Sequence, residues 1–168
     1  MIEFEKVVLD EAPDWVVVVG DVNATLACSV TAKKLHVKVC HIEAGLRSGD
    51  WTMPEEINRL VTDRLSDLLL TPDKLSIENL KSEGVPDEKI DFVGNIMIDT
   101  LEAQREKAAA MSISDVIKNN LLLEGSDVPD VEEGNFAVMT MHRPSNVDHK
   151  EIVTPMIEFL TGEVALDM

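Results

Sequence analysis

Long apolar runs, basic residues and cysteines are all scarce in this sequence of 168 residues. Its longest apolar runs are far below the roughly 20 residues needed to cross a bilayer, which argues against a membrane-spanning helix. The N-terminus, M-I-E-F-E-K, has no basic region followed by an apolar stretch, so no signal peptide is predicted. Together these absences predict a cytoplasmic protein that makes no use of a membrane.

Basic residues are outnumbered. The chain has 15 lysines and arginines against 32 aspartates and glutamates, for a formal net charge of −17. Nonspecific binding to nucleic acid or to an anionic membrane needs a basic face, so neither is expected as a partner. A small anionic ligand is still compatible with this charge, because a few local basic side chains can outweigh a distant field.

The two cysteines, Cys28 and Cys40, are too few for a disulfide framework. Cys28 lies in an Ala-rich helical pattern and Cys40 in an apolar strand pattern, so we expect buried, reduced thiols. The sequence also lacks a Gly-rich nucleotide fingerprint, metal-ligand spacing and a Ser or Cys nucleophile motif. Neither a metal nor a cofactor is predicted.

Apolar strand patterns alternate with helical patterns along the chain, which predicts βαβ units with parallel strands and right-handed crossovers. The valine run in 15–20 is typical of a strand that is covered on both faces. The predicted fold class is α/β, with a Rossmann-like parallel sheet and flanking helices. We expect strands at 15–20, 37–42, 68–70, 90–93 and 136–141, and helices at 1–12, 23–35, 54–66, 73–83, 97–111 and 148–160.

The composition divides the chain into three parts. We expect residues 1–111 to be the C-terminal part of a first Rossmann-like domain, residues 112–134 to be a polar, acidic connection, and residues 135–168 to begin a second Rossmann-like domain. A doubly wound domain needs several β-α units to cover its sheet. We therefore expect this sequence to be the middle of a longer protein.

Titratable residues recur at the predicted strand ends and at one helix start. Asp21, Glu43 and His142 follow apolar strands, and Glu55 opens a helix. Ligands of open α/β sheets bind beyond the carboxyl ends of the strands. Carboxylates crowded in a cleft repel one another, so one tends to keep its proton, which supplies an acid and a base for moving a proton on and off carbon.

Each of these residues also has a structural explanation. Asp21 could cap the following helix, Glu43 could pair with Arg47, and Glu55 has capping-box spacing from Thr52. The histidine could simply be solvated. Taken together, however, the four positions favour a site at one edge of the sheet.

Five sequence blocks, in order, resemble the non-hydrolysing UDP-N-acetylglucosamine 2-epimerases. The H-I-E-A-G-L-R and P-E-E-I-N-R blocks are the most specific, and the resemblance extends over about residues 4–160. The blocks are V-G-D at 19–21, H-I-E-A-G-L-R-S-G-D at 41–50, M-P-E-E-I-N-R at 53–59, V-G-N at 93–95 with Asp99, and T-M-H-R-P-S-N at 140–146.

The resemblance implies a two-domain architecture of the glycosyltransferase-B type, with the substrate between the domains. It also implies inversion at C2 of UDP-GlcNAc to give UDP-ManNAc, by elimination of UDP, a glycal intermediate and re-addition. Asp21, Glu43 and Glu55 match the family's catalytic carboxylates, of which Asp21 and Glu43 also contact substrate. His142 matches a histidine that contacts the nucleotide sugar, and the resemblance implies that Arg143, beside it, also contacts bound nucleotide sugar. Full-length relatives are usually homodimers.

The sequence departs from the family in two places. The Gly-Thr-Arg-Pro-Glu loop of the first strand and the Gly-rich serine segment of the second domain, which hold the nucleotide, are not found in this sequence. Losing several charge-assisted phosphate contacts, at ~1.5–3 kcal/mol each, would remove most substrate affinity. We therefore expect this chain by itself to be inactive and aggregation-prone. The alternatives are a hydrolysing 2-epimerase, a glycosyltransferase-B-type sugar transferase and a non-catalytic fragment.

Overall fold

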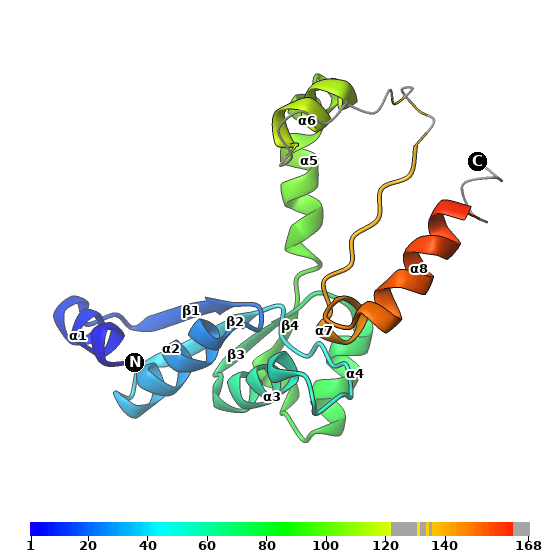
Figure 1. Cartoon of the computed structure of the whole chain (residues 1–168). Coiled ribbons are helices and arrows are strands. Elements are labelled where there is room, and N and C mark those ends of the chain that lie inside the picture. The colour runs from blue at the N-terminus through cyan, green and yellow to red at the C-terminus, as the bar shows by residue number, and fades with distance from the viewer. Residues whose placement is uncertain (122–130, 132–133, 135, 163–168) are drawn as a thin grey trace. The chain divides into compact units, whose positions relative to one another are not determined.

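The computed structural model describes residues 1–121, 131, 134 and 136–162 (Figure 1). Its contacts divide the chain into two units, Met1–Ala103 and Gln104–Met168. All strands of the described residues belong to the first unit. No helix among the described residues is both long enough and apolar enough to cross a membrane.

The first unit is built on a parallel sheet of four strands in the order β1-β2-β3-β4. The strands are β1 (Trp15–Val19), β2 (Lys38–Ile42), β3 (Leu68–Thr71) and β4 (Ile90–Phe92). The helices are α1 (Ile2–Glu11), α2 (Asn23–Lys34), α3 (Pro54–Leu65) and α4 (Lys74–Ser82), with a short 3₁₀ helix η1 (Asp87–Lys89) before β4. The predicted α/β class, with a parallel sheet and flanking helices, is confirmed.

Local chemistry explains where the helices beside the site begin. Pro54 occupies the first turn of α3, where a missing N–H costs nothing, and two glutamates in that turn favour the helix dipole. The carboxylate of Asp73 caps α4 by accepting a hydrogen bond from the Ser76 backbone N–H at 2.7 Å. These signals set the residues at which α3 and α4 begin.

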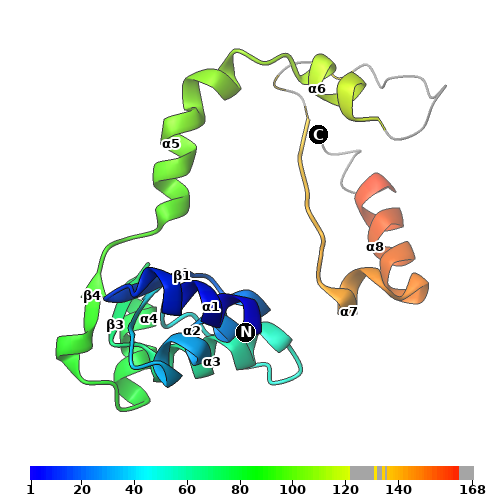
Figure 2. The same cartoon turned by 90° about the vertical axis from the view of Figure 1, so that its left-hand side faces the viewer.

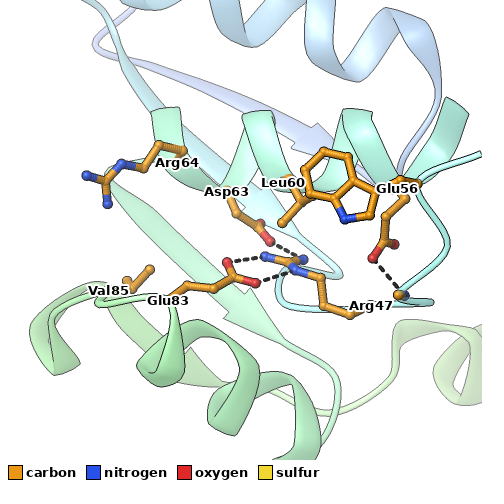
Figure 3. A pocket seen from close by; sticks show the side chains of 9 residues that line it. Arg47, Glu56, Leu60, Asp63, Arg64, Glu83 and Val85 are labelled. Atoms are coloured by element: carbon orange, nitrogen blue, oxygen red, sulfur yellow. Dashed lines mark hydrogen bonds and ion pairs between the residues drawn. The ribbon is translucent and has the colours of Figure 1, made fainter.

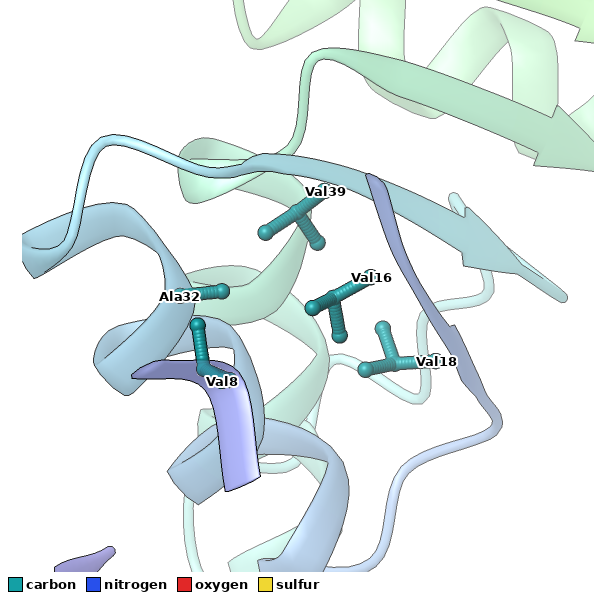
Figure 4. Close-up of a cluster of buried hydrophobic side chains, with 5 residues drawn as sticks. All are labelled: Val8, Val16, Val18, Ala32 and Val39. Carbon is teal, nitrogen blue, oxygen red and sulfur yellow. The ribbon is translucent and has the colours of Figure 1, made fainter. Parts of the chain in front are cut away.

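Small apolar side chains make the core of the first unit. One cluster joins Val8 of α1, Val16 and Val18 of β1, Ala32 of α2 and Val39 of β2 (Figure 4). Burying a valine side chain fully stabilises a fold by about 1.5–3 kcal/mol. The cluster holds α1 and α2 against the sheet, and α1, α2 and α3 lie side by side (Figure 2).

Strand β1 is covered on one face only, so the expectation of two covered faces was wrong. Val16 and Val18 point into the core, whereas Trp15, Val17 and Val19 are between 41% and 57% exposed. The valine run hides this difference, because it lacks the polar residues that normally mark an open face. β1 is also a terminal strand in the sheet order.

The regular secondary structure among the described residues of the second unit consists of helices. Helix α5 (Ile96–Ala109) begins in the first unit, and α6 (Ile113–Asn120), α7 (Pro144–Val147) and α8 (Lys150–Gly162) follow. The helices expected at 97–111 and 148–160 are confirmed as α5 and α8, with shifts of one or two residues at their ends.

Two expectations for this part of the chain differ from the structure. The strand expected at 136–141 was wrong, because this segment pairs with no other strand among the described residues. An apolar pattern alone cannot make a strand where no neighbour accepts its hydrogen bonds. The expected connection at 112–134 contains helix α6, and its acidic residues Asp127, Asp130, Glu132 and Glu133 lie outside the described residues.

Candidate functional site

The site begins where β1 and β2 end side by side. Val19 and Ile42 are register partners, and the Gly20 N–H donates to the Ile42 carbonyl at 3.1 Å. Beyond them, Gly20 and Glu43 both have positive φ, +67° and +70°. A Cβ placed on Gly20 would lie 3.7 Å from Oε2 of Glu43. The Glu43 carboxylate therefore lies close to Gly20, the residue before Asp21, so the structure places both predicted residues at the same edge of the sheet.

Arg59 of α3 holds Asp21 in place. Its Nε and Nη2 atoms lie 2.9 and 2.5 Å from Oδ2 of Asp21. The Asp21 side chain stays 30% exposed, so a ligand can still reach it. Arg59 lies four residues after Glu55 and therefore on the same side of the helix, and this spacing is the sequence signal that places Arg59 near the predicted site. Arg59 belongs to the M-P-E-E-I-N-R block, but the sequence does not predict its pairing with Asp21.

The adjacent glutamates of α3 have different environments. Glu56 is only 2% exposed and accepts hydrogen bonds from Ser48 N at 2.9 Å, Ser48 Oγ at 3.0 Å and Gly49 N at 2.9 Å. Burial alone would raise the pKa of Glu56, but the hydrogen bonds from Ser48, Gly49 and Arg59 lower it to about 2. Glu56 therefore anchors the loop. Glu55 is half-buried and has no hydrogen-bond or ion-pair partner within the described ranges.

The structure excludes three of the structural explanations. The N-cap of α2 is Val22 and that of α3 is Met53, and neither helix start has a side-chain cap from Asp21 or Glu55. Arg47 pairs with two acidic residues other than Glu43. As with Glu55, no partner of the Glu43 side chain is found in the part of the chain that the structure describes. Glu43 and Glu55 thus have no structural partner among the described residues, and Asp21 pairs with Arg59 instead of capping a helix.

His142 and Arg143 belong to the second unit. Both are exposed and directly precede α7, for which Arg143 is the N-cap residue without a side-chain cap bond. Their exposure leaves both side chains available to a ligand. It also agrees with the alternative that His142 is simply solvated.

A cavity of about 620 Å³ in the first unit is lined by residues of α3 and of the loops around it, among them Arg47, Asp63 and Glu83 (Figure 3). Arg47 makes a bidentate pair with Glu83, at 2.7 Å for both bonds, and a contact of 2.8 Å with Asp63. Burial alone would lower the pKa of Arg47, but Glu83 and Asp63 raise it. Neither Asp21 nor Glu43 lines this cavity.

Both cysteines are free thiols, with Cys40 buried and Cys28 half-buried. Burial raises the pKa of the Cys40 thiol. Among the described residues, no group of three or more His, Cys, Asp or Glu side chains is placed to hold a metal ion. The titratable groups that the structure places at this edge are the carboxylates of Asp21 and Glu43 and the guanidinium of Arg59.

Comparison with known proteins decides the family. The family model described as UDP-N-acetylglucosamine 2-epimerase matches residues 1–165. The chain belongs to this family. A UDP-N-acetylglucosamine 2-epimerase of Methanococcus maripaludis is 40% identical over 162 residues, which cover 94% of this chain and 40% of that protein. A UDP-2,3-diacetamido-2,3-dideoxy-D-glucuronate 2-epimerase of Pseudomonas aeruginosa is 37% identical over 164 residues, 95% of this chain and 41% of that protein.

A solved structure of the family has the same fold. The chain resembles the crystal structure of Methanocaldococcus jannaschii UDP-GlcNAc 2-epimerase in complex with UDP-GlcNAc and UDP, with a TM-score of 0.76 and 38% identity. The match covers 95% of this chain and 42% of that one. The chain thus spans about two fifths of the length of these epimerases.

Proposed function

We propose that this chain carries the acid–base residues of a non-hydrolysing UDP-N-acetylglucosamine 2-epimerase, which converts UDP-GlcNAc into UDP-ManNAc. The observation that carries the proposal is the juxtaposition of Asp21 and Glu43 at the ends of adjacent parallel strands, in a member of this family. The binding of UDP-GlcNAc and UDP by the related archaeal enzyme supports the substrate class.

The reaction needs one group to remove the C2 proton and another to deliver a proton to the opposite face. Removal of the proton expels UDP from C1 and leaves a glycal, and UDP adds back as C2 is reprotonated. Asp21 is ion-paired with Arg59, while Glu43 and Glu55 are not paired in the described residues. Carboxylates in unlike environments are suited to the separate roles of acid and base.

The second unit supplies the proposed nucleotide contacts. His142 and Arg143 are exposed basic side chains of the kind that binds a diphosphate by charge-assisted hydrogen bonds. The complete protein is expected to be a homodimer. Because the chain spans about two fifths of its relatives, we expect it alone to show little or no turnover.

The test is a chimera in which residues 1–165 replace the matching part of the M. jannaschii epimerase. With UDP-GlcNAc in deuterated water, the chimera should incorporate deuterium at C2 and form UDP-ManNAc. Asp21→Asn and Glu43→Gln should each abolish the label. Asp67→Asn, which removes a carboxylate paired with Lys33 far from Asp21 in the sequence, should retain it.

The products distinguish the alternatives. A chimera that folds and binds UDP but leaves C2 unlabelled would contradict the proposed function. Release of free ManNAc and UDP would indicate the hydrolysing reaction instead. Labelling only of the 2,3-diacetamido glucuronate nucleotide would place the chain with the relative from P. aeruginosa.

A further inference from the structure

Asp63 lies behind the two strand ends and has three partners that belong to β2 and the loop after it. It is 2% exposed and belongs to α3. Its Oδ1 atom lies 2.6 Å from Nδ1 of His41. Its Oδ2 atom accepts the Gly45 N–H at 3.0 Å and lies 2.8 Å from Nη1 of Arg47 (Figure 3). A buried carboxylate with this many donors is held in one orientation.

His41 extends the contact to the neighbouring strand. The ring is fully buried, and its Nε2 atom lies 2.9 Å from the carbonyl oxygen of Gly20. A carbonyl can only accept, so Nε2 carries a proton and donates it. A second proton must lie between Nδ1 and the Asp63 carboxylate. Through this ring, Asp63 fixes the backbone immediately before Asp21.

The Gly45 contact fixes the backbone after Glu43. The N–H of Gly45 is bound by Asp63, and its carbonyl accepts a hydrogen bond from Nδ2 of Asn79 at 2.9 Å. Gly45 has φ of +82°, and Glu43 has φ of +70°, which is unfavourable for a residue with a side chain. Hydrogen bonds to both the N–H and the carbonyl of Gly45 thus fix the turn in which Glu43 has a left-handed conformation.

We propose that Asp63 is a positioning residue that sets the relative placement of Asp21 and Glu43, through His41 to Gly20 and through the Gly45 N–H. The importance of that placement rests on the proposed function. The contact between Asp63 and the two strand ends is a geometric claim that can be tested without turnover. If no deuterium is incorporated at C2, the proposed function fails, but the contacts of Asp63 can still be tested by the experiment below.

The experiment compares Asp63→Asn with Asp67→Asn in the full 168-residue chain by ¹H–¹⁵N NMR. The carboxamide cannot accept from all the donors around Asp63, so the amide signals of Asp21, Glu43 and Gly45 should shift together. Hydrogen exchange of the Gly45 amide should be faster by at least about tenfold. Asp67 accepts from Lys33 Nζ and from the Val39 N–H, at the opposite end of β2, so its variant is a matched loss of charge.

Asp67→Asn should leave the signals of Asp21, Glu43 and Gly45 unchanged. Unchanged signals in Asp63→Asn, or equal shifts in both variants, would overturn the inference. If Asp63→Asn fails to fold, the unaltered chain gives the answer. Its Gly45 amide should be protected from exchange and should show a coupling across the hydrogen bond to the Asp63 carboxyl carbon. An amide with neither property would reject the role of Asp63.

Discussion

Glu55 and Glu56 are neighbours in the sequence, but their side chains have different hydrogen-bond partners and different exposure. Glu56 is enclosed by the loop N–H groups and by Arg59, whereas Glu55 keeps access to solvent without a partner in the described structure. A pKa that is lower in the folded state than in the unfolded state means that ionisation of the group stabilises the folded state. The shift from 4.5 to about 2 corresponds to about 3 kcal/mol for Glu56.

Replacing Glu56 should therefore destabilise the chain. We expect Glu56→Gln to lower the free energy of unfolding by about 3 kcal/mol at neutral pH, because the Ser48 and Gly49 donors lose a charged, buried acceptor. Urea denaturation followed by circular dichroism measures this change. Glu55→Gln is the matched control and should stay within about 0.5 kcal/mol. Equal losses in both variants would contradict the different environments.

The same carboxylate predicts a pH dependence. The folded-state pKa of Glu56 is below its ordinary value, so its contribution is complete above about pH 4.5 and disappears as the pH falls toward about 2. Asp67 acts in the same direction, since hydrogen bonds from Lys33 and the Val39 N–H lower its pKa against the effect of burial. Denaturation between about pH 6 and pH 3 should show a shallower loss for Glu56→Gln than for the unaltered chain. Parallel curves would rule out this role for Glu56.

At the scale of elements, the loop from β2 to α3 contains two glycines whose surroundings differ. Gly45 and Gly49 both have positive φ, +82° and +72°. A Cβ on Gly45 would collide with the backbone carbonyl of Ser76 in α4, whereas a Cβ on Gly49 would meet nothing within 4 Å. The loop thus packs closely on α4 at one glycine and is open at the other.

This contrast gives a prediction with an internal control. Gly49→Ala should cost about 1 kcal/mol, which is the penalty of a left-handed residue. Gly45→Ala should cost more than about 3 kcal/mol, because the loop must also move away from α4. Thermal unfolding of the two variants measures the difference. Similar melting temperatures would show that the loop is not packed on α4 as described.

At the scale of the whole molecule, the exposed apolar face of β1 is the surface that we expect to cause self-association. Trp15, Val17 and Val19 are exposed on a terminal strand, next to a core that is only one helix layer deep at this point. Exposed apolar strand edges favour association with other chains. The high negative charge opposes association, but at an ionic strength of ~0.1 M salt largely screens this repulsion at separations beyond about 10 Å.

We therefore expect self-association that depends on concentration and on this face. Light scattering should show larger species as concentration rises, and the double variant Val17→Lys with Val19→Lys should shift the population toward monomer. Leu75→Lys, at an exposed apolar position of α4, is the control and should leave the association unchanged. Equal effects of both changes would point to net charge rather than to the β1 face.

Much of the fold was predictable because its signals are local. Every strand of the first unit, and the helices between them, lie within a few residues of the sequence prediction, since apolar runs and the residues that end them act over short stretches. The strand expected at 136–141 had the same kind of signal and failed. A strand also needs a neighbour, and the local pattern carries no information on whether one is present.

The candidate site divides in the same way. The sequence by itself determined the order of the strands and helices and the placement of Asp21, Glu43 and Glu55 at strand ends and a helix start, because these follow from local apolar periodicity. Only the tertiary structure decided that Glu56 is the buried neighbour, and that Arg59 reaches Asp21 across 38 positions. It alone showed that Arg47 turns to Asp63 and Glu83. Such pairings depend on which elements pack together, and the energy of a buried charge is set by neighbours distant in sequence.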